Sequence, residues 1–295
     1  MYFFHYDEPL FRPPSEAESL IFQITIGCSH NGCRFCGMYK MKRFHLRGLD
    51  QILAEIRSIP ARYRPVVRRV FLADGDALIY PQAGLATILD ALAETFPALT
   101  RVGAYASPRS LATKTGDELA ALREKKLRIL YFGLESGDAD TLRLINKGYG
   151  PEEMLLLCRK AQDAGMKLSV TAILGLAGRA RSAEHAAATA AWVTALAPEY
   201  FSLLTMFMRH NEEYLSSIEA LTHGEILQEA HALLLRMEPQ RTILRSNHVS
   251  NFLELAGSYP KDRQRLIDIA AAALAEAKLH PDWSSQVPAY QEEYF

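Results

Sequence analysis

Three cysteines within nine consecutive residues are the strongest chemical signal in this chain. Cys28, Cys33 and Cys36 come directly after an apolar run at residues 20–26. A cubane of four irons takes one ligand per iron, so three thiolates from one loop leave one iron open to a ligand that is not protein. The spacing therefore predicts a [4Fe-4S] cluster with one reactive corner.

A structural zinc site is the alternative for the same loop, with His30 or His45 as a fourth ligand beside three thiolates. Zinc knuckles rarely follow a buried strand at the start of successive βα units, so the iron cluster is favoured.

The fourth cysteine, Cys158, lies in a helical pattern and is expected to be a small buried apolar residue. This cysteine distribution is not a disulfide framework and is typical of a reducing compartment.

The composition is that of a globular protein with a sizeable core, at 295 residues, 49% apolar and 23% charged. The formal net charge of -1 gives no electrostatic indication of a polyanion, so nucleic acid is not an expected partner. The N-terminus lacks the pattern of a secretory signal, and the Ala-rich stretch at 186–197 is too short to span a membrane. We therefore expect a cytoplasmic protein without a membrane partner.

Apolar runs alternate with helical patterns from about residue 20 to about residue 210. The candidate strands are residues 20–26, 67–73, 101–106, 128–134, 168–174 and 200–207. Strands that alternate with helices of roughly 10 to 15 residues predict βαβ crossovers and a parallel sheet covered on both faces. The expected fold class is therefore α/β.

Several helix ends are marked by their residues. Thr115 followed by Glu118 has capping-box spacing, and Pro151 opens a helix whose first turn is acidic. Gly165 predicts the end of that helix, and Pro198 follows the end of the Ala-rich one.

The pattern changes beyond residue 209, where three helices and one extended segment are expected. These are residues 212–220, 225–237 and 261–279, and the extended piece 242–245. We expect an N-terminal extension at 1–19, a core barrel at 20–210 and a mostly helical C-terminal appendage at 211–295. The appendage should pack on the barrel because no Gly-, Ser- or Pro-rich linker precedes it.

Polar or small residues follow every predicted strand. In a parallel barrel the carboxyl ends of the strands converge on one mouth, so a site is expected there. The segments concerned are the cysteine loop, Asp74-Gly75-Asp76, Tyr105-Ala-Ser107, Glu135-Ser136-Gly137, Gly175-Leu-Ala-Gly178 and Met208-Arg-His-Asn211.

At these positions the chain resembles the radical SAM (S-adenosylmethionine) superfamily. The resemblance covers about residues 20–210 and depends on the three cysteines with Phe35, on Asp74-Gly75-Asp76 in place of Gly-Gly-Glu, on Gly133-Leu-Glu-Ser-Gly137 and on Gly175-Leu-Ala-Gly178. Asn146-Lys147-Gly148 is similar to the branch with methylthiotransferases, the Elongator catalytic subunit and oxygen-independent coproporphyrinogen oxidase. The family usually has three residues between its first two cysteines, whereas this chain has four.

The resemblance implies a partial (βα)6 TIM-like barrel that holds a [4Fe-4S] cluster on Cys28, Cys33 and Cys36 and binds SAM. In that family an electron from the reduced cluster cleaves SAM, and a 5′-deoxyadenosyl radical abstracts hydrogen from the substrate. The SAM contacts implied are Phe35, Asp74, Gly75, Asp76, Ser107, Glu135, Ser136, Gly175 and Phe207. The alternatives are a Glu135 carboxylate paired with a base such as Lys147, and a plain Asp-Gly turn at 74–76.

The substrate side of the site is marked less clearly. The candidates for substrate contact are His210, Asn211, Asn247 and His248, and the alternative is a structural hydrogen-bond network with a satisfied His248.

Only Cys158 remains for an auxiliary cluster, so a single cluster is expected. The predicted enzyme acts on a small organic molecule or cofactor precursor, with a reducing partner such as flavodoxin or ferredoxin. An RNA or peptide modifier with the same chemistry and a noncatalytic metal- or haem-binding protein are the alternatives.

Overall fold

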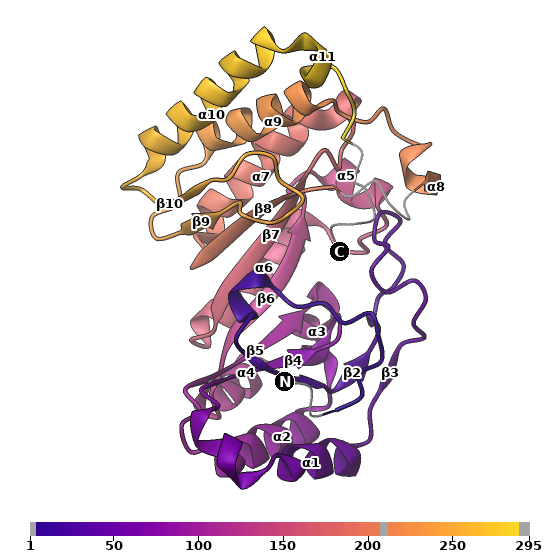
Figure 1. The fold of residues 1–295 in the computed structure, drawn as a ribbon, viewed down its shortest axis with the longest axis vertical. Coiled ribbons are helices and arrows are strands. Elements are labelled where there is room, and N and C mark those ends of the chain that lie inside the picture. The colour runs from indigo at the N-terminus through magenta and orange to yellow at the C-terminus, as the bar shows by residue number, and fades with distance from the viewer. Residues whose placement is uncertain (1–3, 207–211, 289–295) are drawn as a thin grey trace. The chain divides into compact units, whose positions relative to one another are not determined.

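The computed structural model describes residues 4–206 and 212–288 (Figure 1). The described residues form two compact bodies, the first from residues 4–31, 38–132 and 156–168 and the second from residues 32–37, 133–155, 169–206 and 212–288. The cysteine loop is divided between them, because Cys28 belongs to the first body and Cys33 and Cys36 belong to the second.

Parallel strands form the centre of the first body. Their order is β1 (Leu20–Gln23), β4 (Arg69–Ala73), β5 (Arg101–Ala106) and the part of β6 (Leu127–Glu135) up to Phe132. These strands are apolar runs that are almost completely buried, as expected for parallel strands with both faces covered. The helices of this body are α1 (Leu49–Ser58), α2 (Gln82–Thr95), α3 (Pro108–Ala112), α4 (Gly116–Glu124) and the part of α6 (Pro151–Asp163) from Leu156 on. α1 and α2 lie side by side (Figure 1).

The predicted start of α4 is confirmed. The Thr115 side chain accepts a hydrogen bond from the Glu118 amide, and the Glu118 side chain accepts one from the Thr115 amide. This reciprocal pair satisfies two amide donors that the first turn of a helix leaves open.

The first predicted strand is divided in two. After β1 the chain forms β2 (Thr25–Ile26), which pairs antiparallel with β3 (His45–Leu46). The Arg47 amide also donates to the Ile24 carbonyl at 3.1 Å. The chain before the cysteine loop is therefore hydrogen-bonded to the chain after it, and this short pair closes the base of the loop.

The strands of the second body follow the order β7 (Lys167–Leu174), β8 (Tyr200–Thr205), β9 (Ile243–Arg245) and β10 (Ala256–Ser258). β7, β8 and β9 are parallel, and β10 is antiparallel to β9. The predicted extended piece at 242–245 thus joins the sheet as β9. The sequence did not indicate β10, because Ala-Gly-Ser has no β-branched or aromatic residue.

The second body contains the remaining helices. They are α5 (Ala139–Leu144), the part of α6 before Leu156, α7 (Ser182–Leu196), α8 (Glu212–Leu215), α9 (His223–Arg236), α10 (Arg263–Leu279) and α11 (Pro281–Ser284). Short 3-10 turns are Pro14–Glu16, Ala61–Val66, Ala77–Ile79 and Arg179–Arg181. In the second body, α9 packs between α7 and α10 (Figure 1). None of the described helices has both the length and the apolar character needed to cross a bilayer.

Candidate active site

In the first body, Cys28 packs against the turn that follows β4. A Cβ added at Gly75 would lie 3.0 Å from the Cys28 Cβ and 2.6 Å from the Tyr39 ring. Glycine is the residue that allows a turn to approach neighbouring side chains this closely. The Asp74-Gly75-Asp76 turn and the first cysteine are therefore in direct contact.

Asp76 connects the cysteine loop to the end of β5. Its Oδ2 accepts hydrogen bonds from the Ser29 hydroxyl and, at 2.7 Å, from the Ser107 hydroxyl, and its Oδ1 accepts from the Ser107 amide at 3.0 Å. Burial raises the pKa of Asp76, although the hydroxyls of Ser110, Ser29 and Ser107 favour the carboxylate. Asp76 therefore fixes the residue that follows Cys28.

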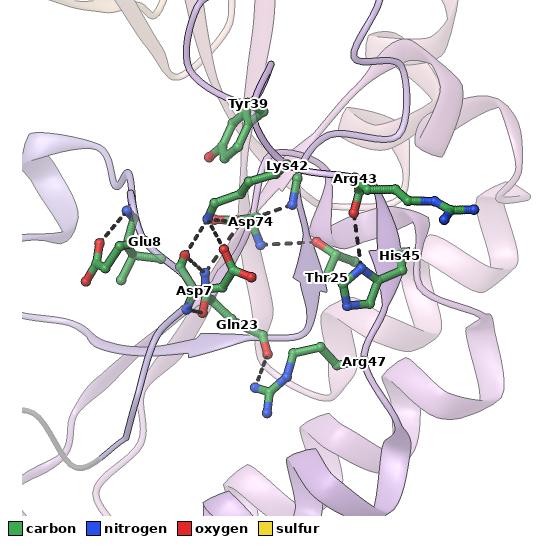
Figure 2. Close-up of polar contacts among 12 residues, drawn as sticks. Asp7, Glu8, Gln23, Thr25, Tyr39, Lys42, Arg43, His45, Arg47 and Asp74 are labelled. Carbon is green, nitrogen blue, oxygen red and sulfur yellow. Dashed lines mark hydrogen bonds and ion pairs between the residues drawn. The ribbon is translucent and has the colours of Figure 1, made fainter.

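Asp74 forms a different set of contacts (Figure 2). Its Oδ2 lies 2.9 Å from the Lys42 Nζ in a buried ion pair and accepts a hydrogen bond from the Gly27 amide at 3.1 Å. Burial raises the pKa of Asp74, and Lys42, Gly27 and Gln23 act against that shift. The Oδ1 atom is buried, and none of the described residues hydrogen-bonds to it. A buried acceptor of this kind fits a ligand that brings a cationic donor.

In the second body, the loop with Cys33 and Cys36 is attached to the end of α5. The Arg34 amide donates to the Ile145 carbonyl at 2.9 Å, and the Asn146 side chain donates to the Gly32 carbonyl at 3.0 Å. Asn146 has a φ of 55°, a left-handed conformation that asparagine tolerates better than most residues. The predicted motif at 146–148 thus supports the cysteine loop.

Glu135, at the end of β6, forms an ion pair with Lys147. The Lys147 Nζ lies 3.0 Å from the Glu135 Oε1, and both side chains are largely buried. Glu135 has a φ of 65°, and its side chain folds back over Gly133, where a Cβ would lie 2.1 Å from the Oε1 atom. The ion pair that the sequence offered as an alternative is therefore present. A strained backbone at a strand end indicates that the surrounding structure fixes this carboxylate firmly.

Ser136 and Gly175 each hydrogen-bond to a side chain that sequence reasoning missed. The Ser136 Oγ, which is fully buried, lies 2.8 Å from the His185 Nδ1, and the Gly175 amide donates to the Glu229 Oε1 at 2.7 Å. His185 lies in an Ala-rich helix, where the local sequence gives no sign of a polar contact. For Glu229 one signal existed, since it lies among the apolar positions of α9 and is itself 2% exposed.

Two substrate candidates are among the described residues. Asn247 is exposed, and the His248 Nδ1 lies 2.9 Å from the Ser250 Oγ, which also accepts a hydrogen bond from the Thr205 amide at 3.1 Å. Burial lowers the pKa of His248. These contacts form a hydrogen-bond network at the end of β8. Phe207, His210 and Asn211 lie outside the described residues.

Neither body by itself gathers three His, Cys, Asp or Glu side chains as metal ligands in the part of the chain that the structure describes. The chemistry of the donor set nevertheless fits an iron–sulfur cluster, because thiolates are its usual ligands. The unsatisfied Asp74 oxygen beside the cysteine loop fits a bound amine.

An α/β protein with a cysteine loop after its first strand and carboxylates at later strand ends has the architecture of iron–sulfur barrel enzymes. The Radical SAM superfamily model matches residues 22–189, more than half of the sequence. The chain belongs to the radical SAM superfamily, whose enzymes use a [4Fe-4S] cluster and SAM. No curated protein sequence matches it significantly.

Solved structures share the fold at low sequence identity. Coproporphyrinogen III oxidase (HemN) from Escherichia coli is 21% identical with a TM-score of 0.57, over 74% of this chain and 52% of that protein. HydG, a maturase of the [FeFe]-hydrogenase, is 13% identical with a TM-score of 0.52, over 85% and 54% of the two chains. Methylornithine synthase is 14% identical with a TM-score of 0.53, over 94% and 84%.

The chain thus spans about half the length of the first two proteins. These similarities confirm the expected α/β fold, that of the partial TIM-like barrel of radical SAM enzymes.

Proposed function

We propose that Cys28, Cys33 and Cys36 hold a [4Fe-4S] cluster at which SAM is cleaved reductively, and that the enzyme abstracts hydrogen from a small organic substrate or cofactor precursor. The observation that supports this best is the contact of Cys28 with Gly75, beside an Asp74 oxygen that is buried and lacks a hydrogen-bond partner among the described residues. When bound, the cluster and SAM supply the 5′-deoxyadenosyl radical.

In this proposal the chain's own residues bind and orient SAM. The Asp74 Oδ1 accepts a hydrogen bond from the amino group of SAM, while its Oδ2 stays paired with Lys42. Asp76 and Ser107 keep the first cysteine in place through Ser29. Glu135, held by Lys147, faces the ribose or the methionine end.

The adenine end is assigned to the backbone at Phe35, Gly175 and Phe207. Ser136 is buried against His185, so it acts by supporting that edge of the site.

A single cluster is part of the proposal. Cys158 is fully buried, and burial raises the pKa of its thiol, which disfavours the thiolate that a second cluster would need. The expected partners are a small-molecule substrate and a protein reductant such as flavodoxin or ferredoxin, since cluster reduction needs an electron from outside the chain.

The proposal is tested by anaerobic reconstitution with iron and sulfide, followed by incubation with SAM and dithionite. We expect 5′-deoxyadenosine and methionine in equal amounts. A protein that assembles the cluster and yields neither product would contradict the assigned reaction.

A further inference from the structure

Glu229 is a carboxylate that lies almost completely inside the second body. Its Oε1 accepts a hydrogen bond from the Gly175 amide at 2.7 Å, and its Oε2 accepts one from the Ser182 hydroxyl at 2.6 Å. A buried carboxylate is costly unless hydrogen bonds compensate it, so these two donors determine where the side chain lies.

His185 extends this connection to a second strand end. Its Nε2 lies 3.8 Å from the Glu229 Oε1, and its Nδ1 lies 2.8 Å from the Ser136 Oγ. Both side chains are completely buried. None of the described residues hydrogen-bonds to Nε2, so the Glu229 carboxylate lies beside the ring without a hydrogen bond to it. Ser136 also accepts from the Asp138 amide at 3.0 Å, which orients its hydroxyl.

The Gly175–Gly178 turn, which Glu229 contacts, has an unusual backbone conformation. Gly175 and Gly178 have φ angles of 80° and 66°, and the Gly178 amide donates to the Gly175 carbonyl at 3.2 Å. Only glycine adopts such angles without strain, so the conformation of this turn depends on both glycines. The Glu229 carboxylate supplies a fixed acceptor at its first residue.

We propose that Glu229 is a positioning residue for SAM: from helix α9 it fixes the Gly175–Gly178 turn, while the neighbouring His185 supports the Ser136 strand end. This inference rests on the proposed function, in which that turn binds the adenine end of SAM. Helix α9 is then part of the cofactor site, and loss of the Glu229 contact would weaken SAM binding even before substrate is present.

Two conservative variants distinguish the effect of side-chain length from the effect of charge at position 229. Glu229→Gln keeps the length of the side chain, and its amide can accept from Gly175 and donate to Ser182. Glu229→Asp keeps the charge but is one methylene too short to reach both donors. Gln228→Ala, on an exposed neighbouring position of α9, is the matched control.

The measurement is the Kd of SAM for the reconstituted full-length protein by equilibrium dialysis without reductant. We expect Glu229→Asp to weaken SAM binding by about tenfold, the effect of one lost hydrogen bond, with Glu229→Gln and Gln228→Ala within about threefold of the parent. In turnover, Glu229→Asp should raise the KM for SAM and leave kcat nearly unchanged.

Parent-like SAM affinity in Glu229→Asp, or a larger loss in Glu229→Gln than in Glu229→Asp, would overturn the inference. If Glu229→Asp does not fold, Ser182→Ala, which removes one donor to the carboxylate, decides the same question, and unchanged affinity in it counts against us. Absence of SAM binding by the parent protein would instead refute the proposed function.

Discussion

The guanidinium carbon of Arg34 lies 5.9 Å from the centroid of the Tyr214 ring. Arg34 stands between Cys33 and Cys36, and Tyr214, which is fully buried, donates its hydroxyl hydrogen to the Leu176 carbonyl. One aromatic side chain thus contacts both the cysteine loop and the turn assigned to adenine. Burial raises the pKa of Tyr214, so its phenol remains a hydrogen-bond donor at neutral pH.

Two changes at Tyr214 should have different effects. Tyr214→Phe keeps the ring beside Arg34 but leaves the Leu176 carbonyl without its donor, so SAM affinity should fall by about threefold to tenfold with normal iron content. Tyr214→Leu also removes the cation–π contact and should lower iron retention. Tyr200→Phe, at a half-buried position in β8, is the control. Equal behaviour of the two Tyr214 variants in both assays would show that the contact with Arg34 is irrelevant.

Gly75→Ala should displace Cys28. The new methyl group would lie 2.6 Å from the Tyr39 ring and 3.0 Å from the Cys28 Cβ, and neither rigid neighbour can yield without moving the cysteine loop. We expect the circular dichroism spectrum to show a folded protein. After reconstitution this variant should contain less iron than the parent. Gly116→Ala, where a Cβ meets nothing within 4 Å, is the matched control in the same body. Normal iron content in Gly75→Ala would contradict the assigned packing.

Acid should weaken the fold through Asp138. Burial opposes its charge, yet the bidentate Arg181 and the Thr141 donors lower its pKa to about 2, against an ordinary value of 3.8. A carboxyl with a lowered folded-state pKa stabilises the protein above its unfolded-state pKa, and that contribution disappears as the pH falls from about 4 to about 2.

Asp138→Asn, which preserves a helix cap on α5, tests this. Urea unfolding should show the parent more stable by up to about 2 kcal/mol at pH 6 and the difference vanishing near pH 2. A stability difference that does not change with pH would contradict the role assigned to the ionised carboxylate.

Local sequence signals predicted the parts of the fold that depend on neighbouring residues. The six apolar runs all contain strands, and the capping pair at Thr115 and Glu118 forms as expected. The Ala-rich helix ends at Leu196, where Ala197 adopts a left-handed conformation before Pro198. In these cases residues a few positions apart carry the information.

Contacts between distant residues could not be predicted in this way. Glu229 meets Gly175 across 54 positions, and His185 meets Ser136 across 49. Glu16, in the N-terminal segment, is fully buried, and its carboxylate lies 2.9 Å from the Arg101 guanidinium. A charged residue in an ordinary polar context gives no local sign that tertiary packing will bury it, so these positions required the structure.

The most direct test of the central claim is the iron content and spectrum of anaerobically reconstituted protein, compared between Cys33→Ala and Cys158→Ala. We expect about four irons per chain in the parent and in Cys158→Ala, with the charge-transfer absorption of a [4Fe-4S] cluster. Cys33→Ala should lose the cluster and remain folded, because two thiolates cannot hold it. A parent protein that binds one zinc ion instead, or a Cys33→Ala variant with undiminished iron, would contradict the account.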